Sequence, residues 1–427
     1  MEEGYEITPV AKEGRRFSLL MLFAVWFGAG ISIAEFWAGA LLTPALSLWA
    51  AVGVIIVGHI IGNAVMGLIA VEGYETGLPT MVLSRGALGI KGSVLPSVLN
   101  YLQLIGWTAV MLIVGANAMN ALSGTFGFES YPLWIIILGA LVTLWTYVGP
   151  RRWEALEKVS ALLLLVLSLW LTYVTVKRFP IGELLSRPGT GDIGVMLALD
   201  LVIAMPLSWA PLVADYSRFA RAKEGAFWGT YLGYFIASSL FYFVGALTNV
   251  AVGESDPIGI ILAYGLGIPA MLIIMLSTLT TTFLDVYSAA ITYKNISPGA
   301  DAKKQVLLVG TLGTLLALVF PVDRYEGFLI LIGGAFVSLT AIMLTDYFVV
   351  RKGYDPEELL DESGPLAGYR WKALAVWGLG FAFYIGLAVE GLLGVHVPLL
   401  SGIGSALGSS IPTFLLVSLL YYLVERR

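Results

Sequence analysis

The chain has 427 residues, of which 58% are hydrophobic and only 12% are charged, and its mean hydropathy is +0.87. Long apolar stretches recur from one end to the other, which excludes a soluble globular protein and indicates a polytopic helical membrane protein. The net charge of −5 is carried mainly by connecting segments, and the absence of cysteine excludes a disulfide framework and a cysteine metal site.

Twelve apolar stretches are long enough to cross ~30 Å of hydrocarbon as helices. They cover residues 17–46, 49–71, 94–120, 132–148, 155–176, 193–213, 226–251, 266–292, 305–321, 327–350, 373–393 and 402–424. With the N-terminus inside, all but four of the 24 Lys and Arg residues fall on the inner side, the exceptions being Lys177, Arg178, Arg187 and Arg324. This asymmetry predicts a multi-pass protein of the cell (cytoplasmic) membrane with both termini cytoplasmic.

The first span carries an acid at membrane depth. Gly28 and Gly30 weaken the helix near its middle, and Glu35 follows within two turns. A charge at this depth costs roughly 2.5–3.5 kcal/mol, so it usually faces a cavity or a partner. Gly28, Ile31, Ser32 and Glu35 share one helix face. We predict a broken, site-forming helix, although an acid bonded to a neighbouring Ser or Thr at a helix interface is the alternative.

The sixth span resembles the first in being interrupted, because Pro206 and Pro211 each remove a backbone donor. Interrupted helices five spans apart are expected of a five-plus-five inverted repeat, although Gly and Pro also occur in membrane helices without one. We predict a single transmembrane domain over residues 1–427, with repeats at about 17–176 and 193–350 and two extra helices at about 373–424.

The eighth span is rich in hydroxyl groups. Ser277, Thr281, Asp285 and Ser288 fall on one helix face, with Thr280 beside them. Hydroxyl oxygens next to the carbonyls of an unwound helix make a hard-oxygen site that suits Na⁺. Ser and Thr also join membrane helices to each other, so helix packing is the alternative interpretation.

The third span places Asn100, Gln103 and Trp107 on one face. An amide and an indole together suit a flat heteroaromatic ligand, because the amide reads its edge while the ring stacks on it. Trp209, beside the interruption of the sixth span, is either a second stacking wall or a packing residue. His59 in the second span is expected to be a packing residue rather than a proton relay.

Other classes of protein fit the sequence less well. The chain lacks the zinc-protease, phosphate-loop and serine-hydrolase motifs and any nucleic-acid-binding feature, and two distant histidines without cysteine make an intramembrane enzyme a poor interpretation. The polar groups cluster on spans 1, 3, 6 and 8 instead of repeating around one axis, as an ion channel would require. No nucleic-acid partner and no obligate protein partner are predicted.

Residues 208–219 (SWAPLVADYSRF) and 80–89 (TMVLSRGALG) resemble the end of span 6 and the loop between spans 2 and 3 in the nucleobase:cation symporter family, the cytosine permease and hydantoin transporter group. Residues 31–36 (ISIAEF) and 100–111 (NYLQLIGWTAVM) are most similar to its branch of hydroxymethylpyrimidine transporters, which is linked to thiamine salvage.

This resemblance implies an all-α, leucine-transporter (LeuT)-type fold of twelve transmembrane helices, with discontinuous helices 1 and 6, two additional C-terminal helices and alternating access. It also implies Na⁺ as a coupling ion, with no other cofactor. The resemblance places the ion at five positions, Gly28, Ile31, Ser277, Thr280 and Thr281. Cytosine permeases carry asparagines where this chain has Thr282 and Asp285, which argues against cytosine itself.

The sequence therefore predicts a secondary transporter, not an enzyme, that imports a pyrimidine together with Na⁺ across the lipid bilayer. The favoured substrate is 4-amino-5-hydroxymethyl-2-methylpyrimidine. Glu35 is expected to accept a hydrogen bond from the exocyclic amine and to donate to, or share a proton with, the ring nitrogen. The predicted substrate-binding residues are Ser32, Glu35, Gln103, Trp107, Trp209 and Asp285. The alternatives are a permease for cytosine or another nucleobase, and a proton-coupled symporter that uses Glu35 or Asp285.

Overall fold

The computed structural model describes residues 6–148, 154–265, 267–320 and 325–426. Regular structure in these ranges is helical, apart from one isolated bridge between Phe17 and Ala220. The α-helices are α1 Leu19–Gly30, α2 Ile33–Leu41, α3 Leu48–Thr76, α4 Thr80–Leu88, α5 Val94–Gly124, α6 Tyr131–Val148, α7 Glu154–Arg178, α8 Ile181–Ser186, α9 Val195–Trp209, α10 Val213–Ser217, α11 Lys223–Val252, α12 Pro257–Ala263, α13 Ile268–Ile296, α14 Ala302–Ala317, α15 Tyr325–Thr345, α16 Pro356–Leu360, α17 Trp371–Leu393, α18 Pro398–Leu407 and α19 Ser410–Glu425. Two short 3₁₀ turns, η1 Lys12–Gly14 and η3 Ala210–Leu212, and the π-helical turn η5 Asp346–Val350 complete them.

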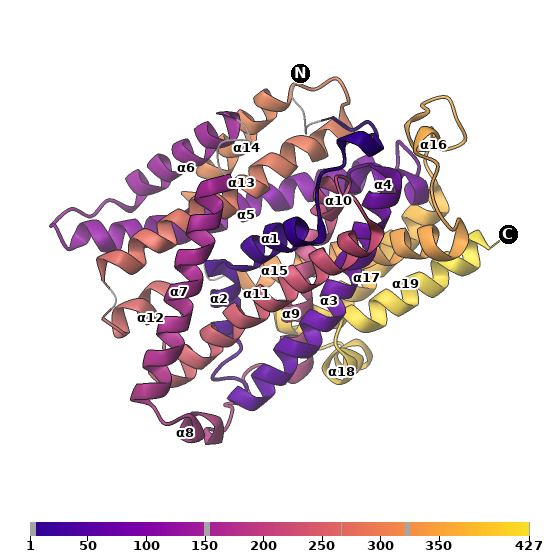
Figure 1. Ribbon diagram of the computed structural model, residues 1–427. Helices are drawn as coiled ribbons and strands as arrows, with labels where there is room; N and C mark the ends of the chain where they lie inside the picture. Colours follow the sequence, from indigo (N-terminus) through magenta and orange to yellow (C-terminus); the bar gives the residue numbers. More distant parts are fainter. Residues whose placement is uncertain (1–5, 149–153, 266, 321–324, 427) are drawn as a thin grey trace.

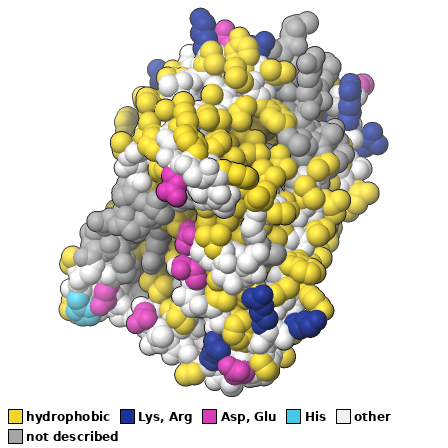
Figure 2. Space-filling view, turned by 90° about the vertical axis from the view of Figure 1, so that its left-hand side faces the viewer, with side chains coloured by type: hydrophobic (Ala, Val, Ile, Leu, Met, Phe, Trp, Pro, Cys, Tyr) yellow, Lys and Arg dark blue, Asp and Glu magenta, His cyan; other side chains and the backbone are white. Residues whose placement is uncertain are grey.

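The long helices have the length and surface of membrane spans. In the described ranges, nine helices are long and apolar enough to cross a membrane, or eleven if two bent pairs each count as one span. The remaining predicted span is α14, which has 16 residues. The outer side of α7 is apolar, since Leu162, Val166 and Leu169 are 60%, 55% and 52% exposed at helical spacing. Hydrophobic side chains cover most of the face in Figure 2, and Lys and Arg lie toward its margins.

The helices form one bundle in which α11 packs against α1, α2 and α3 (Figure 1). Both α1 and α2 pack against α11, α3 packs against α9 and α11, and α5 packs against α13. Helices α17 and α19 pack outside α15. The first and last described segments of the chain lie toward the end of the bundle that carries α4, α10 and α16 (Figure 1). The predicted repeat boundaries stay a prediction, and Arg324 and the predicted boundaries at residues 266 and 321 lie outside the described ranges.

The prediction that the first span is broken is confirmed. Helix α1 ends at Gly30 and α2 begins at Ile33, and the two helices are bent by 55° at this point. The sixth span is interrupted more gently, because η3 separates α9 from α10. Of the two prolines, Pro211 lies in η3, whereas Pro206 lies inside α9, so the expected break at Pro206 is wrong.

The last predicted span, 402–424, is not one helix but two, α18 and α19, which are bent by 105°. Gly408 at the bend has a positive φ of 73°, which few residues other than glycine adopt. The carboxylate of Asp200 in α9 accepts hydrogen bonds from the amides of Ser409 (2.6 Å) and Ser410 (2.8 Å), so it satisfies free N–H groups at the start of α19. The segments 72–93, 177–192 and 351–372, which lie between the predicted spans, contain the short helices α4, α8 and α16.

Backbone contact between α2 and α11 depends on two glycines. A Cβ atom added to Gly39 would lie 2.1 Å from the carbonyl oxygen of Tyr242, and one added to Gly245 would lie 1.9 Å from that of Phe36. Both distances are far inside van der Waals contact, so only glycine allows the two helices to approach this closely. This contact brings the side chains of α2 directly against those of α11.

Two sets of long-range contacts involve buried polar residues outside the first span. The amide of Thr80 donates to Asp215 Oδ1 (3.1 Å), and the amide of Ala214 donates to Thr80 Oγ1 (2.8 Å), so α4 and α10 cap each other. His59 joins α3 to α11, because its Nε2 lies 2.7 Å from Ser238 Oγ and its ring packs edge-on against Tyr242. His59 therefore has the packing contacts that were expected of it.

Candidate functional site

The bend between α1 and α2 interrupts the regular hydrogen bonds of the first span. Helix α1 ends because Ile31 (φ −87°, ψ 78°) and Ser32 (φ −139°, ψ 155°) leave the helical conformation. The last carbonyls of a helix lack the amide four residues ahead, so they can turn toward another partner. On the C-terminal side of the bend, Ser32 Oγ accepts a hydrogen bond from the amide of Ala34 at 3.1 Å and so caps the start of α2.

A small cavity, here called the oxygen-lined cavity, lies beside this bend. It has a volume of about 10 Å³, enough for one particle of the size of water. All five predicted ion-binding positions line it together with three apolar residues: Gly28, Ile31, Ser277, Thr280 and Thr281, with Ala161, Leu164 and Leu284. The structure therefore brings together residues from α1, α7 and α13 that are up to 256 positions apart (Gly28 and Leu284).

The oxygen-lined cavity offers neutral oxygen atoms. The Ser277 hydroxyl is buried and has no hydrogen-bond partner within the described ranges, whereas Thr280 Oγ1 donates to the Ser277 carbonyl at 3.0 Å. No group of three or more His, Asp or Glu residues in these ranges is arranged to hold a metal ion. Carbonyl and hydroxyl oxygens are the ligands that hard cations prefer. Because these oxygens are neutral and the cavity is small, the site suits a small monovalent cation.

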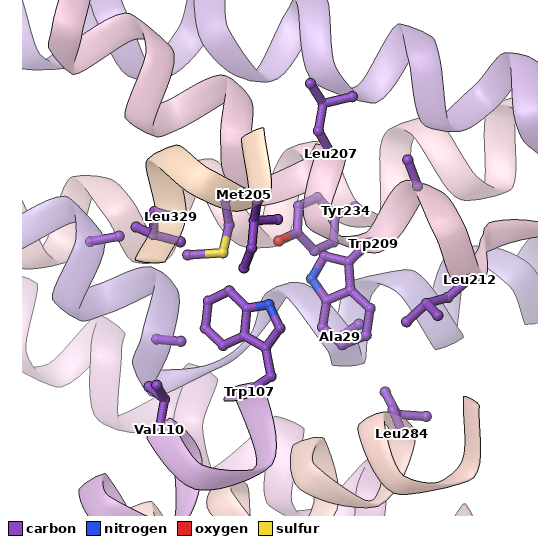
Figure 3. Close-up of a cluster of buried hydrophobic side chains, with 14 of the residues drawn as sticks. Ala29, Trp107, Val110, Met205, Leu207, Trp209, Leu212, Tyr234, Leu284 and Leu329 are labelled. Carbon is purple, nitrogen blue, oxygen red and sulfur yellow. The ribbon is translucent and has the colours of Figure 1, made fainter. Parts of the chain in front are cut away.

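A second cavity, here called the indole cavity, lies next to the first and shares Thr281 with it. Its volume is also about 10 Å³. Five of the six predicted substrate-binding residues line it with four others: Ser32, Glu35, Trp107, Trp209 and Asp285, with Ala34, Met111, Met205 and Thr281. Figure 3 shows the indole rings of Trp107 and Trp209 beside each other, with Met205 and Tyr234 nearby.

Glu35 is the acid of the indole cavity that α2 contributes. Its side chain is 1% exposed, and its Oε1 accepts a hydrogen bond from the Tyr234 hydroxyl at 2.7 Å. Its Oε2 makes no hydrogen bond to any described residue. A buried carboxylate oxygen without a donor is unfavourable, so Oε2 is an acceptor available to a ligand. Asp285 from α13, which is 3% exposed, brings a second carboxyl group to the same cavity.

Further aromatic rings pack against the two tryptophans of the indole cavity. Trp37 stacks on Tyr325 with ring centroids 4.5 Å apart and an interplanar angle of 6°, and Tyr325 lies edge-on to Trp107 at 6.0 Å. On the other side, Trp209 lies edge-on to Trp26 at 6.0 Å. Sites for small organic ligands usually measure several hundred Å³. The lining side chains must therefore move apart before a six-membered ring can enter.

Gln103 is the predicted substrate-binding residue that does not line the indole cavity, and its part in substrate binding stays a prediction. Its Nε2 donates to Asn100 Oδ1 (2.8 Å) and to the Ser208 carbonyl (2.9 Å), so the amide is turned toward α9. This contact joins α5 to Ser208, the residue before Trp209, and so helps to hold Trp209 in place beside the indole cavity.

Several residues around the site were missed by the sequence interpretation. Met111 lies one turn after Trp107 and Met205 one turn before Trp209, so helical spacing from the two tryptophans was a usable signal for both. Tyr234 carried no such signal, because its contact with Glu35 depends on how α2 packs against α11. The same holds for Tyr325, which reaches the site from α15.

Comparison with known proteins identifies the family. A family model described as permease for cytosine/purines, uracil, thiamine, allantoin matches residues 9–407. The chain is similar to the cytosine permease of Escherichia coli (strain K12), with 26% identity over 375 residues that cover 88% of this chain and 87% of the relative. It is also similar to the hydantoin permease of Microbacterium maritypicum, with 27% identity over 417 residues that cover 88% and 84%, respectively.

A solved structure has the same fold. Mhp1, a nucleobase-cation-symport-1 family transporter whose structure in a closed conformation has bromovinylhydantoin bound, superposes with a TM-score of 0.81 at 23% identity, over 97% of this chain and 95% of Mhp1. This likeness confirms the predicted LeuT-type helical fold, and the permease relatives confirm that the chain is not an enzyme. The chain belongs to the nucleobase:cation symporter family of permeases, and it is a multi-pass membrane transporter of nucleobase-like substrates.

Proposed function

We propose that the protein imports an amino-substituted pyrimidine, 4-amino-5-hydroxymethyl-2-methylpyrimidine, by symport with Na⁺. The observation that carries this proposal is the buried Glu35 Oε2, which has no hydrogen-bond partner in the described ranges and belongs to a residue that lines the indole cavity. An exocyclic amine supplies the donor that this oxygen lacks. A charge-assisted hydrogen bond in a buried site favours an amine-bearing ring over a ring with a carbonyl at that position.

The rest of the indole cavity supports a flat aromatic ligand. Trp107 and Trp209 offer ring faces for stacking, and the flexible side chains of Met111 and Met205 can adapt to its outline. Asp285 offers a second acidic acceptor, which suits a ligand with another donor such as a hydroxymethyl group. Ser32 lies at the start of α2 and lines the indole cavity beside Glu35. In this proposal Gln103 acts through its contact with α9.

The oxygen-lined cavity supports Na⁺ as the coupling ion. We assign the carbonyl groups of Gly28 and Ile31 and the hydroxyl groups of Ser277, Thr280 and Thr281 as the ligands. Because α1 and α13 both contribute ligands, a bound ion would hold the bend of the first span against α13. That bend also begins α2, which carries Glu35, so ion binding would favour the geometry that binds the pyrimidine.

Cytosine is the alternative substrate, because its 4-amino group offers the same donor to Glu35. Asp285 would accept from the hydroxymethyl group of the pyrimidine, whereas cytosine would offer it the ring N1–H. Coupling to protons through Glu35 or Asp285 is the alternative to Na⁺. We further propose that the protein lies in the cell membrane with both termini cytoplasmic, in keeping with the distribution of Lys and Arg.

A binding experiment tests this proposal. Purified protein is titrated calorimetrically with 4-amino-5-hydroxymethyl-2-methylpyrimidine, cytosine and uracil, in Na⁺ and in choline at one pH. We expect the hydroxymethylpyrimidine to bind most tightly, with an affinity at least about tenfold higher in Na⁺. Glu35→Gln should weaken this binding by about tenfold or more, because it removes the charge from the acceptor. Equal binding of uracil, or unchanged affinity in Glu35→Gln, would show that the proposal is wrong.

A further inference from the structure

Glu35 accepts a hydrogen bond from a hydroxyl group of α11. The Tyr234 hydroxyl donates to Glu35 Oε1 at 2.7 Å, and both side chains are almost fully buried at 0% and 1% exposure. A phenol hydroxyl bonded to a carboxylate in a dry environment makes a strong, charge-assisted hydrogen bond. The interaction joins two helices whose backbones are in contact at Gly39 and Gly245, so the relative position of the two side chains is well defined.

The surroundings of Tyr234 limit how its ring can move. Trp26 and Trp209 both lie near the ring, with centroids 6.3 Å and 6.5 Å away, and His59 lies at 6.5 Å on the side of α3. One turn along α11, Ser238 Oγ lies 2.7 Å from His59 Nε2. His59 Nδ1 lies 2.8 Å from the Ile55 carbonyl, which can only accept, so Nδ1 carries the proton and Nε2 accepts from Ser238.

The direction of these hydrogen bonds matters for Tyr234. Because Ser238 donates to His59, its proton is directed away from the Tyr234 hydroxyl, and the remaining oxygen lone pairs of Ser238 are weaker acceptors than a carboxylate. The Tyr234 proton is therefore directed to Glu35 Oε1. The two oxygens of Glu35 then differ: Oε1 is engaged by the protein, whereas Oε2 has no partner within the described ranges.

We propose that Tyr234 is a positioning residue that engages Glu35 Oε1 and so leaves Oε2 as the acceptor for the amine of the substrate. This inference rests on the role of Glu35 in the proposed function. Without the Tyr234 hydroxyl, neither oxygen of Glu35 accepts a hydrogen bond from α11. The carboxylate can then rotate, and Oε2 is no longer held toward the ligand. Tyr234 thus contributes to the selection of amine-bearing rings without touching the ligand itself.

Tyr242 provides a matched control for Tyr234. It lies on the same helix, it is 0% exposed, and its hydroxyl makes no hydrogen bond to any described residue. Tyr234→Phe and Tyr242→Phe each remove one buried hydroxyl from α11, but only the first removes a hydrogen bond to Glu35. A difference between these two variants therefore reports the bond and not the loss of a buried oxygen.

The test measures the affinity of both variants for 4-amino-5-hydroxymethyl-2-methylpyrimidine and for its analogue with a 4-oxo group. We expect Tyr234→Phe to weaken binding of the amino compound by about three- to tenfold and to reduce its preference over the oxo analogue, in keeping with the loss of one hydrogen bond to a charged group. Tyr242→Phe should bind both compounds within about twofold of the wild type. The thermal midpoint of each variant, measured without ligand, shows whether it is folded.

A double-mutant cycle separates this inference from the proposed function. In a Glu35→Gln background, Tyr234→Phe should change the affinity by less than about twofold, because the charged acceptor that it positions is gone. If Glu35→Gln weakens binding but Tyr234→Phe behaves like Tyr242→Phe, or if the two effects simply add, the positioning role is wrong while the proposed function stands. If Glu35→Gln itself leaves the affinity unchanged, the proposed function is wrong.

Discussion

Thr281 is the residue at which the two cavities meet. It lines the oxygen-lined cavity together with Gly28 and Ile31, and it lines the indole cavity together with Glu35 and Asp285. Because the Thr281 side chain borders both cavities, a bound ion and a bound ligand would both contact it. Binding of the ion can therefore affect binding of the ligand through this one side chain. The proposed coupling of Na⁺ to substrate therefore depends on this residue more than on any other hydroxyl of α13.

Replacement of Thr281 by valine tests this role, because valine has a similar shape but no hydroxyl group. We expect Thr281→Val to raise the Na⁺ concentration needed for half-maximal ligand binding by about fivefold, the effect of losing roughly 1 kcal/mol from one oxygen ligand. Thr282→Val is the control, since Thr282 Oγ1 donates to the Thr278 carbonyl within α13 and lines neither cavity. The same Na⁺ dependence in both variants would contradict the role of Thr281.

At the level of single residues, the sequence was most informative about polar groups whose burial in a membrane costs free energy. Glu35 could be singled out because an acid at that depth requires a partner. The hydroxyl groups of α13 could be grouped because they recur at helical spacing. Tyr234 could not be found, since its role comes from the approach of α11 to α2, and no local pattern records that approach. The sequence also could not show that Gln103 donates to the backbone carbonyl of Ser208, because this contact depends on how α5 packs against α9.

Among the elements, the pair formed by α2 and α11 fixes the geometry of the site. Gly39 and Gly245 let the two backbones touch, and the Glu35–Tyr234 hydrogen bond spans the same interface. In a membrane, close packing and hydrogen bonds between helices supply much of the free energy of helix association. Burying apolar surface away from lipid contributes little, because lipid tails are themselves apolar. A side chain inserted at this contact should therefore affect both stability and ligand binding.

Gly245→Ala places a methyl group 1.9 Å from the Phe36 carbonyl oxygen, a backbone atom that cannot turn aside. We expect it to destabilise the protein by about 1–3 kcal/mol and to lower its thermal midpoint in detergent. Gly53→Ala is the matched control in α3, because a Cβ atom there meets nothing within 4 Å, and it should be neutral or slightly stabilising. Equal thermal midpoints for the two variants would show that the contact is not tight.

The elements also show which breaks in a helix can be predicted. The bend between α1 and α2 was predictable, because two glycines and the capping Ser32 lie at the break itself. The bend between α18 and α19 was not, because it depends on Asp200, which is 209 residues away from Ser409 in the sequence. Pro206 gave a misleading signal, since α9 accommodates it without a break.

Across the whole molecule, residues from six helices meet at two adjacent cavities. Helices α1, α2, α5, α9 and α13 each provide lining residues, and α7 closes the oxygen-lined cavity with Ala161 and Leu164. Such a site holds together only while these helices keep their relative positions. A bound ion and a bound pyrimidine would each stabilise the same arrangement, which is the physical basis of symport.

Uptake into proteoliposomes tests this coupling most directly. The protein is reconstituted, and labelled 4-amino-5-hydroxymethyl-2-methylpyrimidine is supplied outside at a fixed pH, with either an inward Na⁺ gradient or choline in place of Na⁺. We predict accumulation above the external concentration in the wild type only with the Na⁺ gradient, and no accumulation in Glu35→Gln. Accumulation that is equal in choline, or that follows a proton gradient instead, would contradict Na⁺ symport, and accumulation of cytosine but not of the hydroxymethylpyrimidine would contradict the proposed substrate.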